Sequence, residues 1–259
     1  MICIDENLKT TLKSLAEKYE VSSFCDGDPS CILRRYHDIA DIEIASFIAA
    51  MLAFGRREQF LPKIDYIMKC ADKYNGPAQW ILGEKYLINF IPENIDSEKK
   101  FYRFYSWTDL IILFSRLNKI LKTNQTLGNH IYSCFETYKK NNEQNNITLV
   151  DIFSSEFYDC KIVPKGKNSA NKRVHMFLRW MVRRNSQVDL GLWTWYNPAE
   201  LIIPLDTHVL QEAIKLGLLP EKSIGSAKTA KLLTEKLKEI WHDDPCKGDF
   251  ALFGLGVSI

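Results

Sequence analysis

The sequence has few of the features that mark a metal-binding or a membrane protein. Its seven cysteines are scattered and odd in number, and neither C-x-x-C nor C-x-H spacing occurs. This argues against a zinc ribbon, an iron–sulfur cluster and a disulfide framework. The longest uncharged apolar run, 44–55, is too short to span a bilayer. The start of the chain carries Asp5 and Glu6 where a signal peptide needs positive charge. We therefore expect a cytoplasmic protein with no membrane partner, no metal and no cofactor.

The composition is that of a folded protein, but its charge is unevenly spread. Hydrophobic residues make up 46% of the 259 residues and charged residues 25%, which allows a packed core and excludes wholesale disorder. The net charge of +2 by itself indicates no partner. The window 161–184, however, holds eight of the 34 basic residues and none of the 32 acidic ones. One short segment is therefore strongly positive in an otherwise mildly acidic chain.

Apolar residues recur at helical spacing almost everywhere, so we predict an all-α fold. Four helices have recognisable starts: one at 41–55 capped by Asp41, one behind a capping box of Ser106 and Asp109, one at 226–241, and one near Pro245 capped by Asp244. The Asn-rich stretch 141–146 is expected to be a surface loop. The one extended piece that we expect is a short segment at 201–204.

The basic window combines a tight turn with an amphipathic helix. The turn contains Lys165, Gly166 and Lys167. Free backbone amides beside lysines and a helix N-terminus make a phosphate-binding site. In the helix that follows, one face is apolar and the other carries Lys172, Met176, Arg179 and Arg183. The alternative for this segment is a solvated basic surface without a binding role.

Two residues have side chains suited to covalent chemistry on a sugar. Lys172 lies in the first turn of the predicted helix, where the helix dipole and Arg173 disfavour an ammonium ion. A neutral lysine amine is a nucleophile able to form a Schiff base. Asp206 begins another helix, either as a plain N-cap or as an ionised carboxylate that stabilises positive charge on a substrate. His208 has no companion ligands, so we expect it to pack or to hydrogen-bond.

The order of basic turn, amphipathic helix, apolar spacer and P-L-D-T-H-V at 204–209 resembles the helix-hairpin-helix DNA glycosylase superfamily. The endonuclease III branch of that superfamily has V-D-T-H-V at this place. The segments 41–55 and 249–256 are similar to its early and closing helices. The whole chain looks closest to a bacterial family distantly related to the archaeal type of 8-oxoguanine glycosylase. The iron–sulfur cysteines of endonuclease III are absent, and Gly166 stands alone where the superfamily usually has G-x-G.

The resemblance implies a DNA repair glycosylase, possessing β-lyase activity, that removes an oxidised purine such as 8-oxoguanine from double-stranded DNA. Asp206 would stabilise the oxocarbenium-like sugar, and Lys172 would attack C1′ and form a Schiff base. Asp249 and Phe253, one helical turn apart, resemble a pair that holds the flipped base, and Arg56 would fill the gap left behind. The DNA backbone would be bound by Lys165, Gly166, Lys167, Arg179 and Arg183.

The same resemblance implies a single glycosylase-like unit of two helical subdomains, with Lys172 and Asp206 in the crevice between them. A helical subdomain is expected at about 30–160, and a basic hairpin and catalytic segment at 161–217. The helices of 218–259 are expected to pack with the N-terminus. We expect a monomer without an iron–sulfur cluster.

Several alternatives stay open from the sequence. Lys165 or Lys167 could supply the attacking amine, and if no lysine reaches the sugar, Asp206 would activate water and leave the strand uncut. A non-catalytic helix-hairpin-helix protein would bind DNA or RNA in a salt-dependent way without chemistry. A structural or interaction protein would bind no nucleic acid.

Overall fold

The computed structural model describes residues 4–90, 99–141 and 147–257. These parts are mostly helical, with one two-stranded sheet among them, so the predicted all-α class is confirmed. Most of the expected linker at 141–146 lies outside the described residues. In the described parts we find no helix that combines the length and the apolar character needed to cross a bilayer.

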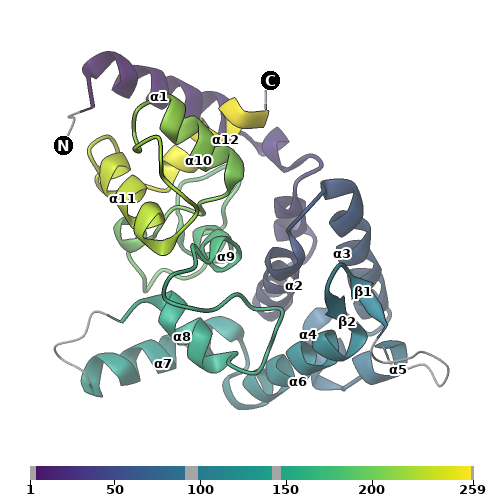
Figure 1. Cartoon of the computed structure of the whole chain (residues 1–259). Helices are drawn as coiled ribbons and strands as arrows, with labels where there is room; N and C mark the ends of the chain where they lie inside the picture. Colours follow the sequence, from purple (N-terminus) through teal and green to yellow (C-terminus); the bar gives the residue numbers. More distant parts are fainter. Residues whose placement is uncertain (1–3, 91–98, 142–146, 258–259) are drawn as a thin grey trace. The chain divides into compact units, whose positions relative to one another are not determined.

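The chain divides into two compact units (Figure 1). One unit, here called the central unit, is Pro29–Lys165. The other, the terminal unit, combines Met1–Asp28 with Gly166–Ile259, so it contains both ends of the chain. The boundary at Gly166 falls inside the expected basic hairpin, and Lys165 therefore belongs to a different unit from Lys167.

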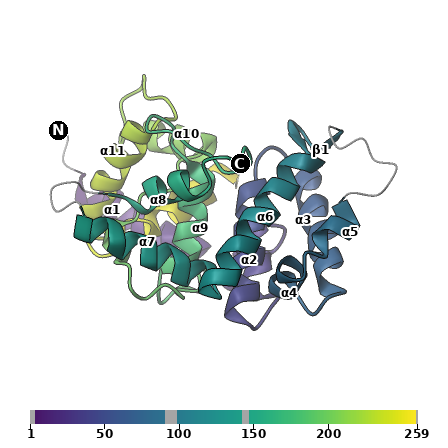
Figure 2. The same ribbon diagram turned by 90° about the horizontal axis from the view of Figure 1, so that it is seen from below.

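The central unit is organised around one helix that is buried on nearly every side. Its elements are η2 (Pro29–Arg34), α2 (Ile39–Leu52), α3 (Arg57–Asp72), α4 (Pro77–Leu82), α5 (Tyr86–Phe90), β1 (Lys100–Tyr102), β2 (Tyr105–Ser106), α6 (Trp107–Asn124), α7 (Leu127–Asn141) and α8 (Leu149–Glu156). α2 has an unbroken run of buried residues at 43–52. It contacts η2, α3, α4 and α7, and Figure 2 shows α3 and α4 beside it. Burial of this apolar run is the main driving force for the unit.

Two helix starts in this unit show how single side chains set boundaries. α6 begins with the predicted capping box of Ser106 and Asp109. The prediction for α2 was wrong, because Asp38 and not Asp41 has the extended backbone of an N-cap, and the helix ends at Leu52, short of residue 55. The Asp41 carboxylate instead accepts a hydrogen bond of 2.7 Å from the backbone amide of Ala78 in α4.

The sheet lies in a place that the sequence did not indicate. β1 and β2 form a short antiparallel hairpin. The expected extended piece at 201–204 is not part of a strand. It is held by a hydrogen bond of 3.1 Å from the backbone amide of Ile203 to the hydroxyl of Thr234. A buried side chain here satisfies a backbone group that a sheet would otherwise pair.

The terminal unit packs the start of the chain against its last helix. Its elements are α1 (Glu6–Tyr19), η1 (Ser22–Cys25), α9 (Lys172–Val182), η3 (Pro198–Glu200), α10 (Thr207–Lys215), α11 (Ala227–Lys238) and α12 (Lys247–Val257). α12 contacts α1 and α10. The approach to α1 is close, because a Cβ atom at Gly254 would lie 2.2 Å from the ring of Tyr19. α12 begins at Lys247, two residues later than expected, since Asp244 is paired with Arg183 and does not cap the helix.

Candidate active site

The structure brings together the amine and the carboxylate that the sequence singled out. Lys172 is the first residue of α9, and Asp206 is the N-cap of α10. Lys172 Nζ lies 3.9 Å from Asp206 Oδ2, and the two side chains are 30% and 20% exposed. This separation exceeds hydrogen-bonding distance but lies within the range of an ion pair, so the amine and the carboxylate interact through their charges. Both residues belong to the terminal unit, and no crevice between subdomains is needed to pair them.

The two oxygens of Asp206 have different partners. Oδ1 accepts a hydrogen bond of 2.9 Å from the backbone amide of Val209 and so caps α10. Oδ2 faces the amine of Lys172. The plain N-cap and the functional carboxylate are therefore compatible interpretations of one residue.

The turn before α9 fixes the position of Lys172. Asn171 has a left-handed backbone with φ 44°, which asparagine tolerates better than most residues. Its side-chain amide donates a hydrogen bond of 3.0 Å to the backbone oxygen of Gly166. Gly166 itself has φ 104°, a conformation that favours glycine. These two residues close the turn and place Lys172 at the helix start.

A second acidic group, Asp249, interacts electrostatically with this pair. Asp249, in the first turn of α12, is buried and paired with Arg179. Burial raises the pKa of Asp249 to about 6, and the charge of Asp206 adds to this rise, whereas Arg179 and Lys172 oppose it. The carboxyl thus changes its protonation near neutral pH within electrostatic reach of Lys172. Because its side chain is enclosed with Arg179, the expected direct contact of Asp249 with a flipped base is not supported.

Arg179 and Arg183 do not form a basic surface, so their assignment to the DNA backbone was wrong. Both are buried, and Arg183 is only 1% exposed. Arg183 pairs with Asp189 at 2.5 Å, with Asp244 at 2.8 Å and with Glu20 at 2.9 Å. These acidic residues hold the pKa of Arg183 above its usual range although burial opposes this. The two arginines on the α9 face that looks basic in the sequence therefore belong to an internal ion-pair network.

The hairpin lysines also differ from one another. Lys165 is partly buried, and its amine donates hydrogen bonds to the backbone oxygens of Phe157 and Cys160. Desolvation lowers the pKa of this amine. Lys165 therefore serves its own unit and is not available to a phosphate, which corrects its assignment. Lys167 is exposed, as a phosphate contact requires.

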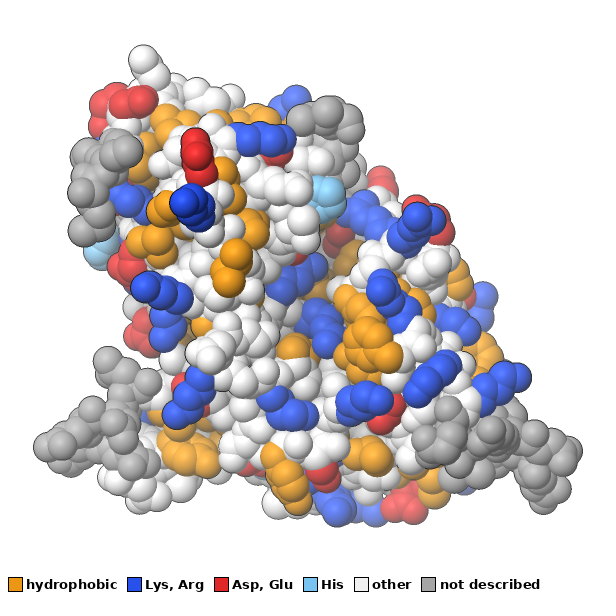
Figure 3. All heavy atoms as spheres, viewed as in Figure 1, with side chains coloured by type: hydrophobic (Ala, Val, Ile, Leu, Met, Phe, Trp, Pro, Cys, Tyr) orange, Lys and Arg blue, Asp and Glu red, His pale blue; other side chains and the backbone are white. Residues whose placement is uncertain are grey.

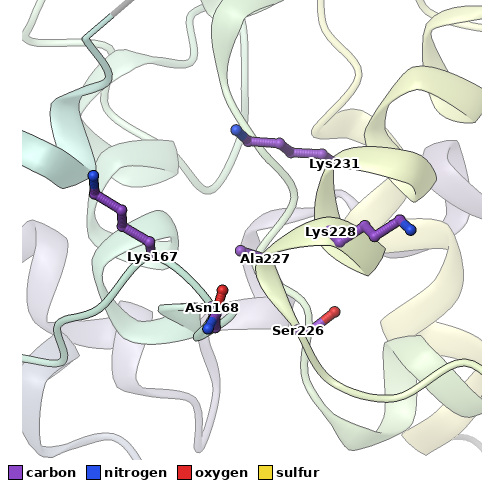
Figure 4. Close-up of a pocket in the computed structure, with 6 residues that line it drawn as sticks. All are labelled: Lys167, Asn168, Ser226, Ala227, Lys228 and Lys231. Atoms are coloured by element: carbon purple, nitrogen blue, oxygen red, sulfur yellow. The ribbon is translucent and has the colours of Figure 1, made fainter.

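Lys167 lies beside a pocket that the sequence did not predict. The pocket has a volume of about 460 Å³ and is lined by Lys167, Asn168, Ser226, Ala227, Lys228 and Lys231 (Figure 4). The backbone amide of Ala227 donates a hydrogen bond of 3.0 Å to the backbone oxygen of Asn168, which ties the hairpin to the start of α11. In Figure 4 the amine of Lys231 points toward the side of Lys167, and that of Lys228 points the other way. A helix N-terminus with three lysines favours an anion.

The two remaining predicted residues have different surroundings. Phe253 is partly buried in α12, with its ring 5.7 Å from Phe24 and 6.4 Å from His208. It still offers an aromatic face near the start of α10. Arg56 is exposed at the start of α3 in the central unit.

Basic side chains, in blue, are widespread on the face of the molecule drawn in Figure 3.

Comparison with known proteins adds a family but no activity. A family model described as "Protein of unknown function (DUF2400)" matches residues 28–258. No curated protein and no solved structure shows significant similarity to the chain.

Proposed function

The chain belongs to the family described as "Protein of unknown function (DUF2400)". From its residues we propose that it is a DNA glycosylase with β-lyase activity. The observation that carries the proposal is the 3.9 Å separation between the Lys172 amine and the Asp206 carboxylate at the starts of two helices. We also propose that the helical architecture is of the helix-hairpin-helix glycosylase kind.

The residues present are sufficient for attack on a deoxyribose. Once Lys172 Nζ has given up its ammonium proton, its lone pair forms a bond to C1′ while the bond from C1′ to the base breaks, and the base leaves with the electron pair and takes up a proton from water. Positive charge develops on the sugar during this step, and the ionised Asp206 carboxylate stabilises it. The sugar ring then opens at the C1′–O4′ bond, which leaves an iminium at C1′ and a protonated O4′. Loss of a proton from C2′ and departure of the 3′ phosphate cut the strand.

In this proposed reaction Asp249 is the proton acceptor. The attacking amine has to lose a proton, and a buried carboxylate with a raised pKa accepts one more readily than an ordinary aspartate. Asp249 lies close enough to Lys172 for their charges to interact. We therefore propose that Asp249 accepts a proton and does not contact the flipped base.

Phe253 remains the proposed aromatic contact of a flipped oxidised purine, since stacking on a partly exposed ring suits an extruded base.

The lysine-lined pocket supports a polyanionic substrate. Lys167, Lys228 and Lys231 are exposed and line the pocket at the N-terminus of α11, with the amine of Lys228 pointing away from Lys167. Phosphates are bound by such groups without reading sequence. Lys228 and Lys231 join Lys167 in the phosphate-binding role that was also assigned to Arg179 and Arg183. The same pocket would serve the second candidate function, a non-catalytic DNA- or RNA-binding protein.

The catalytic proposal is tested by base release from double-stranded DNA containing 8-oxoguanine. We expect Asp206→Asn to slow base release by about a hundredfold or more, the scale on which one transition-state electrostatic contact acts. Asparagine is as good an N-cap as aspartate, so the fold should be kept, and thermal unfolding of both proteins checks this. Base release at an unchanged rate in the variant would contradict the catalytic role of Asp206.

The pH dependence of Schiff-base formation tests the role of Asp249. We expect the rate of adduct formation with abasic-site DNA to rise as the pH increases through about 6, because Asp249 accepts a proton only when it is ionised. Asp249→Asn should remove this inflection. The measurement is single-turnover borohydride trapping from pH 5 to pH 8. An inflection of the same size in the variant would show that another group titrates.

The salt dependence of binding tests the lysine pocket. We expect a variant with both Lys228→Gln and Lys231→Gln to bind duplex DNA more weakly, with a log–log salt slope smaller by about 2, since each phosphate contact contributes roughly one unit. Lys122→Gln is a matched control, because that exposed lysine pairs with Glu84 in the central unit. Fluorescence anisotropy at several salt concentrations provides the data. Equal slopes in the double variant and the wild type would remove the pocket from the proposal.

A further inference from the structure

A cluster of metal-ligand side chains lies in the central unit, outside the candidate active site. His130 and Cys134 lie one helical turn apart on α7, and Glu156 is the last residue of α8. Their ligand atoms all lie within 4.8 Å of one another. His130 Nε2 is 2.7 Å from Glu156 Oε2 and 3.8 Å from Cys134 Sγ. The side chains of His130 and Glu156 are 17% and 25% exposed, so an ion has access to them.

We propose that His130, Cys134 and Glu156 bind one divalent transition-metal ion, for which Zn²⁺ is the natural probe. Imidazole nitrogen, thiolate sulfur and carboxylate oxygen are the ligand types that Zn²⁺ takes in proteins. Ligand bond lengths for a tetrahedral ion place nitrogen and sulfur roughly 3.6 Å apart, close to the observed 3.8 Å. The contact between His130 and Glu156, 2.7 Å in the structure, has to open by less than about 1 Å to reach the separation of two ligands of a tetrahedral ion.

The second nitrogen of the imidazole supports this assignment. His130 Nδ1 lies 3.0 Å from the side-chain oxygen of Asn124, at the end of α6. With Nδ1–H donating to Asn124, Nε2 carries its lone pair toward Glu156 and Cys134, which is the tautomer that a metal requires. Metal-bound histidines usually have such an outer partner.

The surroundings of Cys134 oppose ionisation of its thiol. Burial raises the pKa of Cys134 to about 11, and the charge of Glu156 raises it further. The metal-free thiol is therefore protonated at neutral pH, and a bound cation deprotonates it outright. Binding releases the thiol proton, so affinity should fall as the pH falls. Three protein ligands leave one coordination position for water, and the ion joins α7 to the end of α8.

The site is tested on the full-length protein after treatment with a chelator. We expect the wild type to bind one equivalent of Zn²⁺ in competition with a chromophoric chelator, and Co²⁺ to give a near-ultraviolet thiolate charge-transfer band. Cys134→Ser should abolish the band and weaken Zn²⁺ binding by more than the roughly 10–100-fold lost with an outer partner. Zn²⁺ should raise the unfolding temperature of the wild type and not that of this variant.

Cys31→Ser is the matched control, because Cys31 is an exposed thiol of the same unit and far from the cluster in sequence. This control should keep the band, the stoichiometry and the thermal shift. Absence of tight binding by the wild type would overturn the proposal. So would a band that survives in Cys134→Ser or one that is lost equally in Cys31→Ser. These readouts do not involve DNA, so they are independent of the proposed glycosylase activity.

Discussion

Replacing Lys172 with glutamine is expected to abolish the adduct that borohydride traps between the protein and abasic-site DNA. Only an amine forms the iminium that borohydride reduces to a stable secondary amine, and Lys172 is the lysine whose Nζ lies 3.9 Å from the Asp206 carboxylate. The trapped fraction should fall to the level seen without protein. The assay is a denaturing gel of labelled DNA after reduction.

Controls separate the loss of the nucleophile from the loss of charge or fold. Lys172→Arg keeps the positive charge and should also give no adduct, because a guanidinium does not form a Schiff base under these conditions. Lys165→Gln and Lys167→Gln should keep the adduct, since the amine of Lys165 is engaged with two backbone oxygens and Lys167 lies on the pocket surface. Adduct in Lys172→Gln with none in Lys167→Gln would move the nucleophile to Lys167.

Replacing Arg183 with methionine is expected to lower the free energy of unfolding by about 3–5 kcal/mol. The change leaves the buried carboxylate of Asp189 short of one partner and deprives Asp244 and Glu20 of theirs. Breaking a buried ion pair from one side is costly because an uncompensated charge stays in a poorly solvated place. Chemical denaturation followed by circular dichroism measures the loss.

Arg184→Met is the matched control for this prediction. Arg184 is exposed, and it donates to the backbone oxygens of Thr194 and Tyr196, so its loss should cost less than about 1 kcal/mol. A double variant that combines Arg183→Met with Asp189→Asn should lose less than the sum of the single changes, because the two groups share one interaction. Equal losses of unfolding free energy in Arg183→Met and Arg184→Met would contradict the internal ion-pair network and would indicate that Arg183 lies on the surface.

Local patterns in the sequence were good guides to helices but poor guides to what faces solvent. The capping box at Ser106 and the start of α9 at Lys172 follow from residues within one turn. The arginines of α9 misled because several of their partners are distant in sequence: Asp249 lies 70 residues from Arg179, and Arg183 pairs with Glu20 near the start of the chain. Hydrophobic periodicity shows which face of a helix is apolar. It does not show whether the opposite face packs against buried acidic residues. The basic face of α9 was therefore mistaken for a surface.

The candidate site was only partly predictable, because some of its residues are brought together from distant parts of the sequence. The pairing of Lys172 with Asp206 came from a resemblance in motif order, and the structure places the two groups side by side. Lys228 and Lys231 were missed because their relevance depends on the hairpin meeting the start of α11. The His130, Cys134 and Glu156 cluster was missed because its spacing joins one helical turn to a distant helix end. A search for histidine and cysteine four residues apart on a predicted helix would have found its first half.

The proposed glycosylase and lyase activity depends most on one covalent bond, between the Lys172 amine and C1′ of deoxyribose. The direct measurement is peptide mapping by mass spectrometry of the wild-type protein after borohydride reduction on abasic-site DNA. We predict that the deoxyribose remnant is attached to the peptide containing Lys172 and to that residue within it. An adduct confined to Lys165, Lys167 or another lysine, or no adduct at all under conditions where the protein binds the DNA, would contradict the account.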